Sequence, residues 1–267
     1  MDRKAGINSE CLYGVDPVDA LDYIVDAGFS SIFTGKYDSK KVEKIKSKAD
    51  KNGIEVEFIH APFDGINKLW MAGVDHWDIK NRIIQSIDAA CDNDIPAIIL
   101  HVSSGWNPPE ISDIGLARYD AMVEYAMKKN VIVAFENLRK TGNLAYLMDR
   151  YAKVENVKYC YDCGHEHCYT KTVPMLDLFY NKLICTHIHD NVGKLNDEGD
   201  FDYHFLPFDG NIDYQKMVDK LDEYGYTGSI MLEVFNGKKE EYLQMTNEQF
   251  VRECYSRYER INALSRK

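Results

Sequence analysis

The stretch Ala97-Ile98-Ile99-Leu100-His101-Val102 decides the fold class. It is an almost uninterrupted apolar run that ends at a histidine. Such runs are typical of strands buried on both faces, as in a parallel sheet. A second run of this kind, Val131-Ile132-Val133-Ala134-Phe135, follows residues 111–130, where apolar residues recur at helical spacing. These segments together predict a strand, a helix and a second, parallel strand.

The same alternation continues along the whole chain. Apolar runs begin near Ala5, Ser31, Ile54, Ala97, Val131, Val157, Leu183 and Ser229. Helical patterns fill the gaps, and we expect helices over residues 75–92, 111–130, 213–224 and 245–267. Asp16-Pro17 and Gly28 provide the start and stop signals of another. Strand followed by helix, eight times, predicts an α/β fold, a (β/α)8 TIM barrel that forms a single domain over residues 1–267.

A doubly wound open sheet is the alternative fold. It would normally carry a glycine-rich phosphate loop after the first strand. The segment Gly6-Ile7-Asn8-Ser9-Glu10-Cys11 has no such motif. No linker or change of composition divides the 267 residues, and barrels of this class run to roughly 250 residues.

Composition excludes several classes of protein. The net charge is -11 and no basic stripe is present, which argues against a nucleic-acid partner. No apolar run approaches the roughly 20 residues of a membrane span, and the first six residues lack the apolar stretch of a signal peptide. Seven cysteines, an odd number, indicate reduced thiols and a cytoplasmic location.

Histidines and carboxylates gather where the expected strands end. Active sites of barrel enzymes lie at the carboxyl ends of the strands. Six of the eight histidines fall there: His60, His101, His165, His187, His189 and His204. Three carboxylates, Glu136, Asp162 and Glu233, follow apolar runs directly. We therefore expect all these side chains at one barrel mouth.

Converging carboxylates need a counter-charge. At ~4 Å and an effective dielectric constant of ~20, each like-charged pair costs about 4 kcal/mol. Protons or a divalent cation would relieve this repulsion, and the histidines favour the cation. Imidazole with carboxylate suits Zn, Mn, Fe or Co better than Ca or Mg alone. Cys160 and Cys163 would face opposite sides of a strand, and no second Cys-x-x-Cys pair exists, so we interpret them as structural.

The ordered set of strand-end residues resembles the xylose-isomerase-like TIM barrel superfamily, which includes sugar isomerases and epimerases and the endonuclease IV group. The set is His60-Ala61-Pro62-Phe63, His101, Glu136-Asn137, Asp162-x-x-His165, His187-x-x-Asp190, Asp202-x-His204 and Glu233. The resemblance implies a metal held by Glu136, Asp162, His187 and Glu233. His187 fits the His-x-x-Asp pattern of the family, and His189 is the alternative ligand.

The endonuclease branch holds further ions at the positions of His60, His101, His165, Asp202 and His204, so the resemblance implies one to three ions. Other features depart from that branch. Leu138-Arg139-Lys140 stands where it has Thr-Ala-Gly, and Asp202-Tyr203-His204 stands where it has Asp-Arg-His. These differences and the acidic charge favour the sugar isomerase and epimerase group.

Our leading hypothesis is a metal-dependent isomerase or epimerase of a ketose or aldose, phosphorylated or not. The ion would polarise the carbonyl and stabilise an enediolate, while Glu136 and Glu233 transfer protons. The remaining histidines would bind hydroxyls or a second ion. Phe63, Trp70 and Trp106 would form an apolar wall against the sugar, or serve only in packing. Arg139 and Lys140 are either a phosphate clamp or a solvated loop.

Two other functions stay open. A multi-metal phosphodiesterase of the endonuclease type would cleave abasic DNA with steep salt dependence. A non-catalytic barrel would bind metal or sugar without turnover, and would more often have lost a carboxylate than this chain has. A homo-oligomer is compatible with either.

Overall fold

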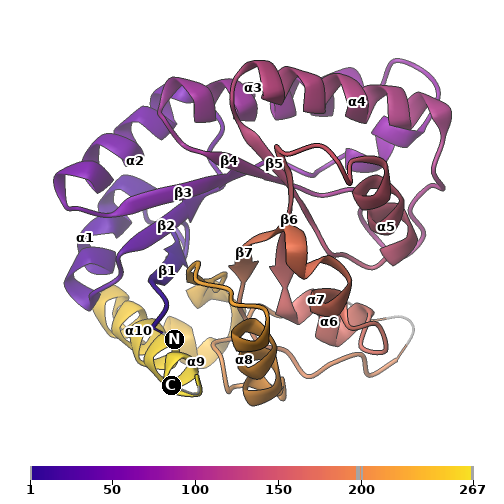
Figure 1. The fold of residues 1–267 in the computed structure, drawn as a ribbon. Helices are drawn as coiled ribbons and strands as arrows, with labels where there is room; N and C mark the ends of the chain where they lie inside the picture. The colour runs from indigo at the N-terminus through magenta and orange to yellow at the C-terminus, as the bar shows by residue number, and fades with distance from the viewer. Residues whose placement is uncertain (1, 197–198, 200, 266–267) are drawn as a thin grey trace.

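The computed structural model describes residues 2–196, 199 and 201–265. Parallel strands form a ring that helices surround (Figure 1). The strands are β1 Ala5–Asn8, β2 Ser31–Thr34, β3 Glu55–His60, β4 Ala97–Leu100, β5 Ile132–Glu136, β6 Val157–Asp162, β7 Leu183–His187 and β8 Ile230–Leu232. Strands β1 to β7 pair in the order of the sequence, and β1 also pairs with β8. The predicted (β/α)8 barrel is confirmed.

The barrel closes through a short seam between β7 and β8. The only bridge across this seam within the described residues joins Ile188 to Leu232. The Ile188 amide donates to the Met231 carbonyl at 2.8 Å, and the Glu233 amide donates to the Ile188 carbonyl at 3.0 Å. The seam therefore positions the residues that flank Ile188 and Leu232 at the barrel mouth.

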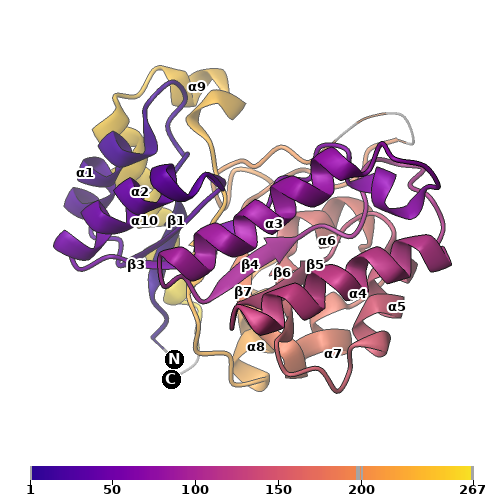
Figure 2. The ribbon, with the colours of Figure 1, turned by 90° about the horizontal axis from the view of Figure 1, so that it is seen from above.

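Helices cover the outside of the ring (Figures 1 and 2). They are α1 Pro17–Ala27, α2 Ser39–Lys51, α3 Trp77–Asp92, α4 Asp113–Lys128, α5 Thr141–Arg150, α6 Cys163–Tyr169, α7 Met175–Phe179, α8 Tyr214–Glu223, α9 Glu240–Leu243 and α10 Asn247–Asn262. Short 3₁₀ segments lie at Ile66–Trp70, Tyr180–Lys182 and Asn236–Lys238. No helix of the described chain is both long and apolar enough to cross a membrane.

Local signals set the helix ends. Asp16 accepts a hydrogen bond from the Val18 amide at 2.9 Å, and Gly28 ends α1 at φ 106°. The expected helix over 111–130 is shorter because Ser112 caps it, accepting from the Gly115 amide at 3.1 Å. The expected last helix, over 245–267, begins after the capping residue Thr246 and ends at Asn262, and its residues 266–267 lie outside the described part.

Two apolar layers support the mouth. The barrel interior holds Phe33, Phe58, Ala97, Ile99, Ala134, Cys160, Cys185 and Met231. A larger core lies between the strands and the helices. Every described cysteine is a free thiol, as expected. An apolar layer inside the barrel therefore lies below the mouth and supports the strand ends.

The two ends of the described chain lie side by side (Figures 1 and 2). The buried Arg3 guanidinium donates to the Asp222 carboxylate at 2.7 Å and to the Tyr226 carbonyl at 2.9 Å. The Arg3 amide donates to Asn262 Oδ1 at 3.1 Å. Arg3 thus ties the first strand to α8 and α10.

Arg3→Ala should lower the free energy of unfolding by about 2–4 kcal/mol, because it removes one partner of a buried ion pair. Its neighbour Lys4 is the matched control, since the Lys4–Glu55 ion pair is about half exposed. Lys4→Ala should cost less than about 1 kcal/mol. Urea denaturation followed by circular dichroism measures both changes. Equal losses in the two variants would contradict this role of Arg3.

Candidate metal centre at the barrel mouth

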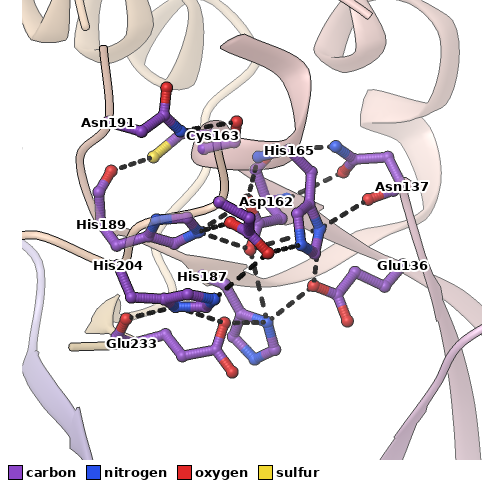
Figure 3. A network of polar contacts seen from close by, with 12 residues as sticks. Glu136, Asn137, Asp162, Cys163, His165, His187, His189, Asn191, His204 and Glu233 are labelled. Atoms are coloured by element: carbon purple, nitrogen blue, oxygen red, sulfur yellow. Dashed lines mark hydrogen bonds and ion pairs between the residues drawn. The ribbon is translucent and has the colours of Figure 1, made fainter. Parts of the chain in front are cut away.

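The carboxyl ends of the strands bring six histidines and four carboxylates together. Figure 3 shows part of this set, including His165, His187, His189 and His204. The histidines are His60, His101, His165, His187, His189 and His204, and the carboxylates are Glu136, Asp162, Asp202 and Glu233. All ten were singled out from the sequence. Strands β3 to β8 and the segments that follow them supply these residues, so the site depends on the closed barrel.

One group is centred on His187. Its Nδ1 lies 3.0 Å from Glu136 Oε1, 3.4 Å from Glu233 Oε2 and 3.9 Å from Asp162 Oδ2. Burial disfavours the charged imidazole, but the carboxylates of Glu233 and Glu136 outweigh it and raise the pKa of His187 to about 10. Three carboxylates therefore share the positive charge of one side chain.

Glu136 is fully buried among imidazoles. Its Oε2 lies 3.3 Å from His60 Nε2 and 3.0 Å from His101 Nε2, and its Oε1 lies 3.3 Å from His165 Nδ1. Burial favours its neutral form, but His187 and His101 hold the pKa of Glu136 well below its usual value. Glu136 is therefore an anion that can serve two neighbouring ions.

A second group is centred on Asp202. Its Oδ2 lies 3.0 Å from His165 Nε2 and 3.3 Å from His204 Nε2, and its Oδ1 lies 3.6 Å from His189 Nε2. The rings of His189 and His204 stack at 4.0 Å. Burial opposes the charged form of His204, but Asp202 raises the pKa of His204 to about 9. Asp162 links this group to the one around His187, because His189 Nε2 lies 3.2 Å from Asp162 Oδ1.

The protein backbone prepares this second group. A Cβ atom at Gly164 would overlap the His189 ring, so only glycine leaves room for it. His204 adopts φ 50°, a left-handed conformation that is uncommon outside glycine and often found at functional sites. Its Nδ1 lies 2.9 Å from the Glu233 carbonyl oxygen, to which it can donate. Both features hold the two stacked imidazoles against Asp202.

Asn137 and Asp190 support the centre, and sequence reasoning assigned them no role. Asn137 clamps Asp162: its Nδ2 donates to the Asp162 carbonyl and its Oδ1 accepts from the Asp162 amide, each at 2.8 Å. Asp190 accepts from the amides of Phe208 and Ile212, and so fixes the segment after β7. Their position in the motifs Glu136-Asn137 and His187-x-x-Asp190 was the available signal.

The three predicted aromatic contacts are in different environments. Phe63 is about half exposed and stacks on His101 at 4.3 Å. Trp106 is also partly exposed. Trp70 does not reach the mouth: it is buried, stacks on Tyr119 and donates its indole N–H to the Val102 carbonyl at 2.7 Å. Of the two alternatives for Trp70, contact with a sugar or packing, the structure favours packing, because the ring lies in the outer core against Gly115.

The donor atoms fit a divalent cation. His187 Nε2, His189 Nδ1 and Asp202 Oδ1 are buried and have no hydrogen-bond partner within the described chain. Such orphaned atoms are rare without an ion or a water. The ligand atoms of Glu136, Asp162, His187 and Glu233 all lie within 4.8 Å of one another. Buried imidazole and carboxylate donors at this spacing are consistent with a divalent metal ion.

A cavity of about 580 Å³ lies elsewhere, between α6, α7 and α8. Cys163 and Glu166 line it, but neither the three central carboxylates nor His187 do. None of the ten residues of the candidate metal centre lines this cavity.

The chain resembles known proteins over most of its length. A family model described as the xylose isomerase-like TIM barrel matches residues 21–254. An uncharacterized protein of Sinorhizobium fredii is 30% identical over 55% of this chain and 49% of its own length, so the match spans about half of that relative. An uncharacterized protein of Methanocaldococcus jannaschii is 23% identical over 93% of this chain and 92% of its own.

Solved structures share the fold at low sequence identity. The 3-keto-D-glucoside 4-epimerase of E. coli superposes with a TM-score of 0.73 at 16% identity, over 95% of this chain and 98% of its own. The D-psicose 3-epimerase of Clostridium cellulolyticum gives 0.73 at 15% identity, over 98% and 100%. These structures show the shared fold. The family model, which matches most of the chain, shows that the chain belongs to the xylose isomerase-like TIM barrel family.

Proposed function

We propose that the protein is a metal-dependent isomerase or epimerase of a sugar. The observation that carries the proposal is the buried group of Glu136, Asp162, His187 and Glu233, which places four metal donors within 4.8 Å at the barrel mouth. Two sugar epimerases with this fold are among its structural neighbours, which supports a sugar as substrate.

Each residue of the group has a distinct task in this proposal. Asp162 and His187 hold the ion together with the two glutamates. His189 contacts both Asp162 and Asp202, and we assign it to the second group. When bound, a divalent cation polarises a carbonyl oxygen and so acidifies the neighbouring C–H bond. The protein itself must then remove a proton from one carbon and return it.

Glu233 and Glu136 are the proposed proton carriers. The Glu233 side chain is 11% exposed and that of Glu136 is not exposed. Glu233 is therefore better placed to touch the sugar. Glu136 would act from its buried position between the imidazoles, on the barrel side of the sugar. The pKa of each carboxyl lies below its usual value despite burial, because His187 and neighbouring histidines stabilise the anion, so both start as bases.

A phosphodiesterase is the second candidate, and a specific observation favours it. His60, His101 and Glu136 form one further donor group, and His189, Asp202 and His204 form another. Clustered ions can activate a water molecule and stabilise both oxygens of a phosphodiester displacement. Cleavage of abasic DNA by the zinc-loaded protein at low salt would establish this activity, and its absence would leave the sugar reaction.

Replacing both glutamates, Glu136→Gln and Glu233→Gln, should abolish exchange of substrate hydrogen with solvent. Proton transfer by a positioned side chain contributes about 10²–10⁴-fold, and here both carriers are lost. Deuterium incorporation into a panel of ketoses, followed by NMR, measures the exchange. Glu57→Gln is the control, since Glu57 is a glutamate of β3 that accepts from Ser229 outside the mouth. Exchange that persists in the double variant would refute these roles.

His187→Asn should weaken binding of the first ion by at least about 10–100-fold, whereas His189→Asn should leave that ion in place. Calorimetric titration with Zn²⁺ or Mn²⁺ measures both.

Ligation needs neutral imidazole, yet the raised pKa values of His187, about 10, and His204, about 9, keep both protonated near neutrality. Ion uptake should therefore release protons, and affinity should rise with pH up to these values. Loss of the first ion in His189→Asn alone would reverse the assignment.

A further inference from the structure

Four side chains form a separate group beside the metal centre. We call Trp106, Arg139, Tyr169 and Lys194 the rim cluster. Trp106 follows β4, Arg139 follows β5, Tyr169 ends the helix after β6 and Lys194 follows β7. In a parallel barrel these segments all emerge at the carboxyl ends of the strands. The rim cluster therefore borders one side of the same mouth.

Aromatic rings connect the rim cluster to the metal centre. Tyr169 stacks on His165 at 5.7 Å. The Arg139 guanidinium carbon lies 3.9 Å from the Tyr169 ring centroid and 5.2 Å from that of Trp106, and Arg139 also donates to the Tyr169 hydroxyl. Trp106 meets Tyr169 edge to face at 5.3 Å. Arg139 is thereby held against Tyr169, and Tyr169 in turn contacts His165 of the metal centre.

A second cation shares the Trp106 ring. Lys194 Nζ lies 5.1 Å from the ring centroid. Each cation–π contact contributes roughly 0.5–1 kcal/mol at an exposed site, but two like charges on one ring repel each other. Both cations also interact with other residues of the chain. Two cations nevertheless lie over one aromatic ring at the mouth.

Lys140 does not share this arrangement. Its Nζ lies 2.5 Å from Glu110 Oε1, and the ion pair points away to the segment before α4. Of the two basic residues that follow Glu136 closely, only Arg139 joins the aromatic rings. The sequence could not separate these neighbours, whereas their contacts do.

We infer that the rim cluster binds an anionic group of the substrate, a phosphate or a carboxylate at the end of the sugar remote from the reacting carbonyl. This inference rests on the proposed function and narrows it to anionic sugars. Guanidinium binds phosphate and carboxylate in a bidentate manner, and a fixed guanidinium loses less entropy on binding. The carboxylates of the metal centre would repel such a group, so it binds at the rim while the carbonyl faces the ion.

The test compares neutral and anionic sugars on the metal-loaded protein. Deuterium incorporation is measured for ketopentoses and ketohexoses, their terminal phosphates, and hexuronates. We expect kcat/KM at least about 10-fold higher for a phosphorylated or a carboxylated sugar than for its neutral counterpart, and the faster of these two arms identifies the anion. Equal values for charged and neutral sugars would overturn the inference while leaving the sugar reaction intact.

Substitutions in the rim cluster test which residues produce the preference for anionic sugars. Arg139→Gln should raise KM for the anionic sugar about 10–100-fold, and Lys194→Gln several-fold, with kcat less affected because the glutamates are untouched. Arg139→Lys should recover part of the loss. Lys140→Gln is the matched control and should change nothing. Unchanged KM in both Arg139→Gln and Lys194→Gln would refute the assignment, and the exposed Lys194 provides this test even if Arg139→Gln fails to fold.

Binding of inorganic phosphate separates this inference from the proposed function. Calorimetry should show phosphate binding to the wild-type protein and its loss in the Arg139→Gln, Lys194→Gln double variant. If no sugar exchanges hydrogen but this difference persists, the sugar reaction fails and the anion site stands. If phosphate binds equally to both proteins, the rim cluster is not an anion site.

Discussion

The structure depends on compensation of negative charge at the barrel mouth. Glu136, Asp162 and Glu233 come from three different strands and converge on one nitrogen of His187. Without a positive centre, carboxylates this close and this buried would repel each other by several kcal/mol per pair. Imidazolium groups supply the positive charge in the ion-free protein, and a divalent cation can supply it more compactly. The fold, the protonation of the histidines and the proposed chemistry all follow from this constraint.

Sequence predicted the barrel and its ring of histidines and carboxylates because both depend on local patterns. Apolar runs such as that ending at His101 mark buried parallel strands, and the parallel arrangement alone collects the strand ends at one mouth. All ten donor residues lie where this reasoning placed them. The distances were needed to show that His187 contacts Glu136 and Glu233 whereas His189 contacts Asp202.

Other features depend on contacts between distant segments, which no local pattern reveals. Trp70 and Trp106 are both tryptophans in loops near the mouth, yet one packs in the core and the other carries two cations. Gly164 matters only because the His189 ring occupies its space. Arg139 and Lys140 are adjacent in sequence but have unrelated partners. Side-chain packing decided each of these cases.

The candidate metal site lies across the seam between β7 and β8. This seam is the least bonded junction of the ring in the described chain, and His187 and Glu233 stand on its opposite sides. A cation bound by both residues would cross-link β7 and β8 at this seam. Ion binding and closure of the barrel would then be coupled. Loss of the ion would weaken the contact between β7 and β8 before it affected the apolar interior of the barrel.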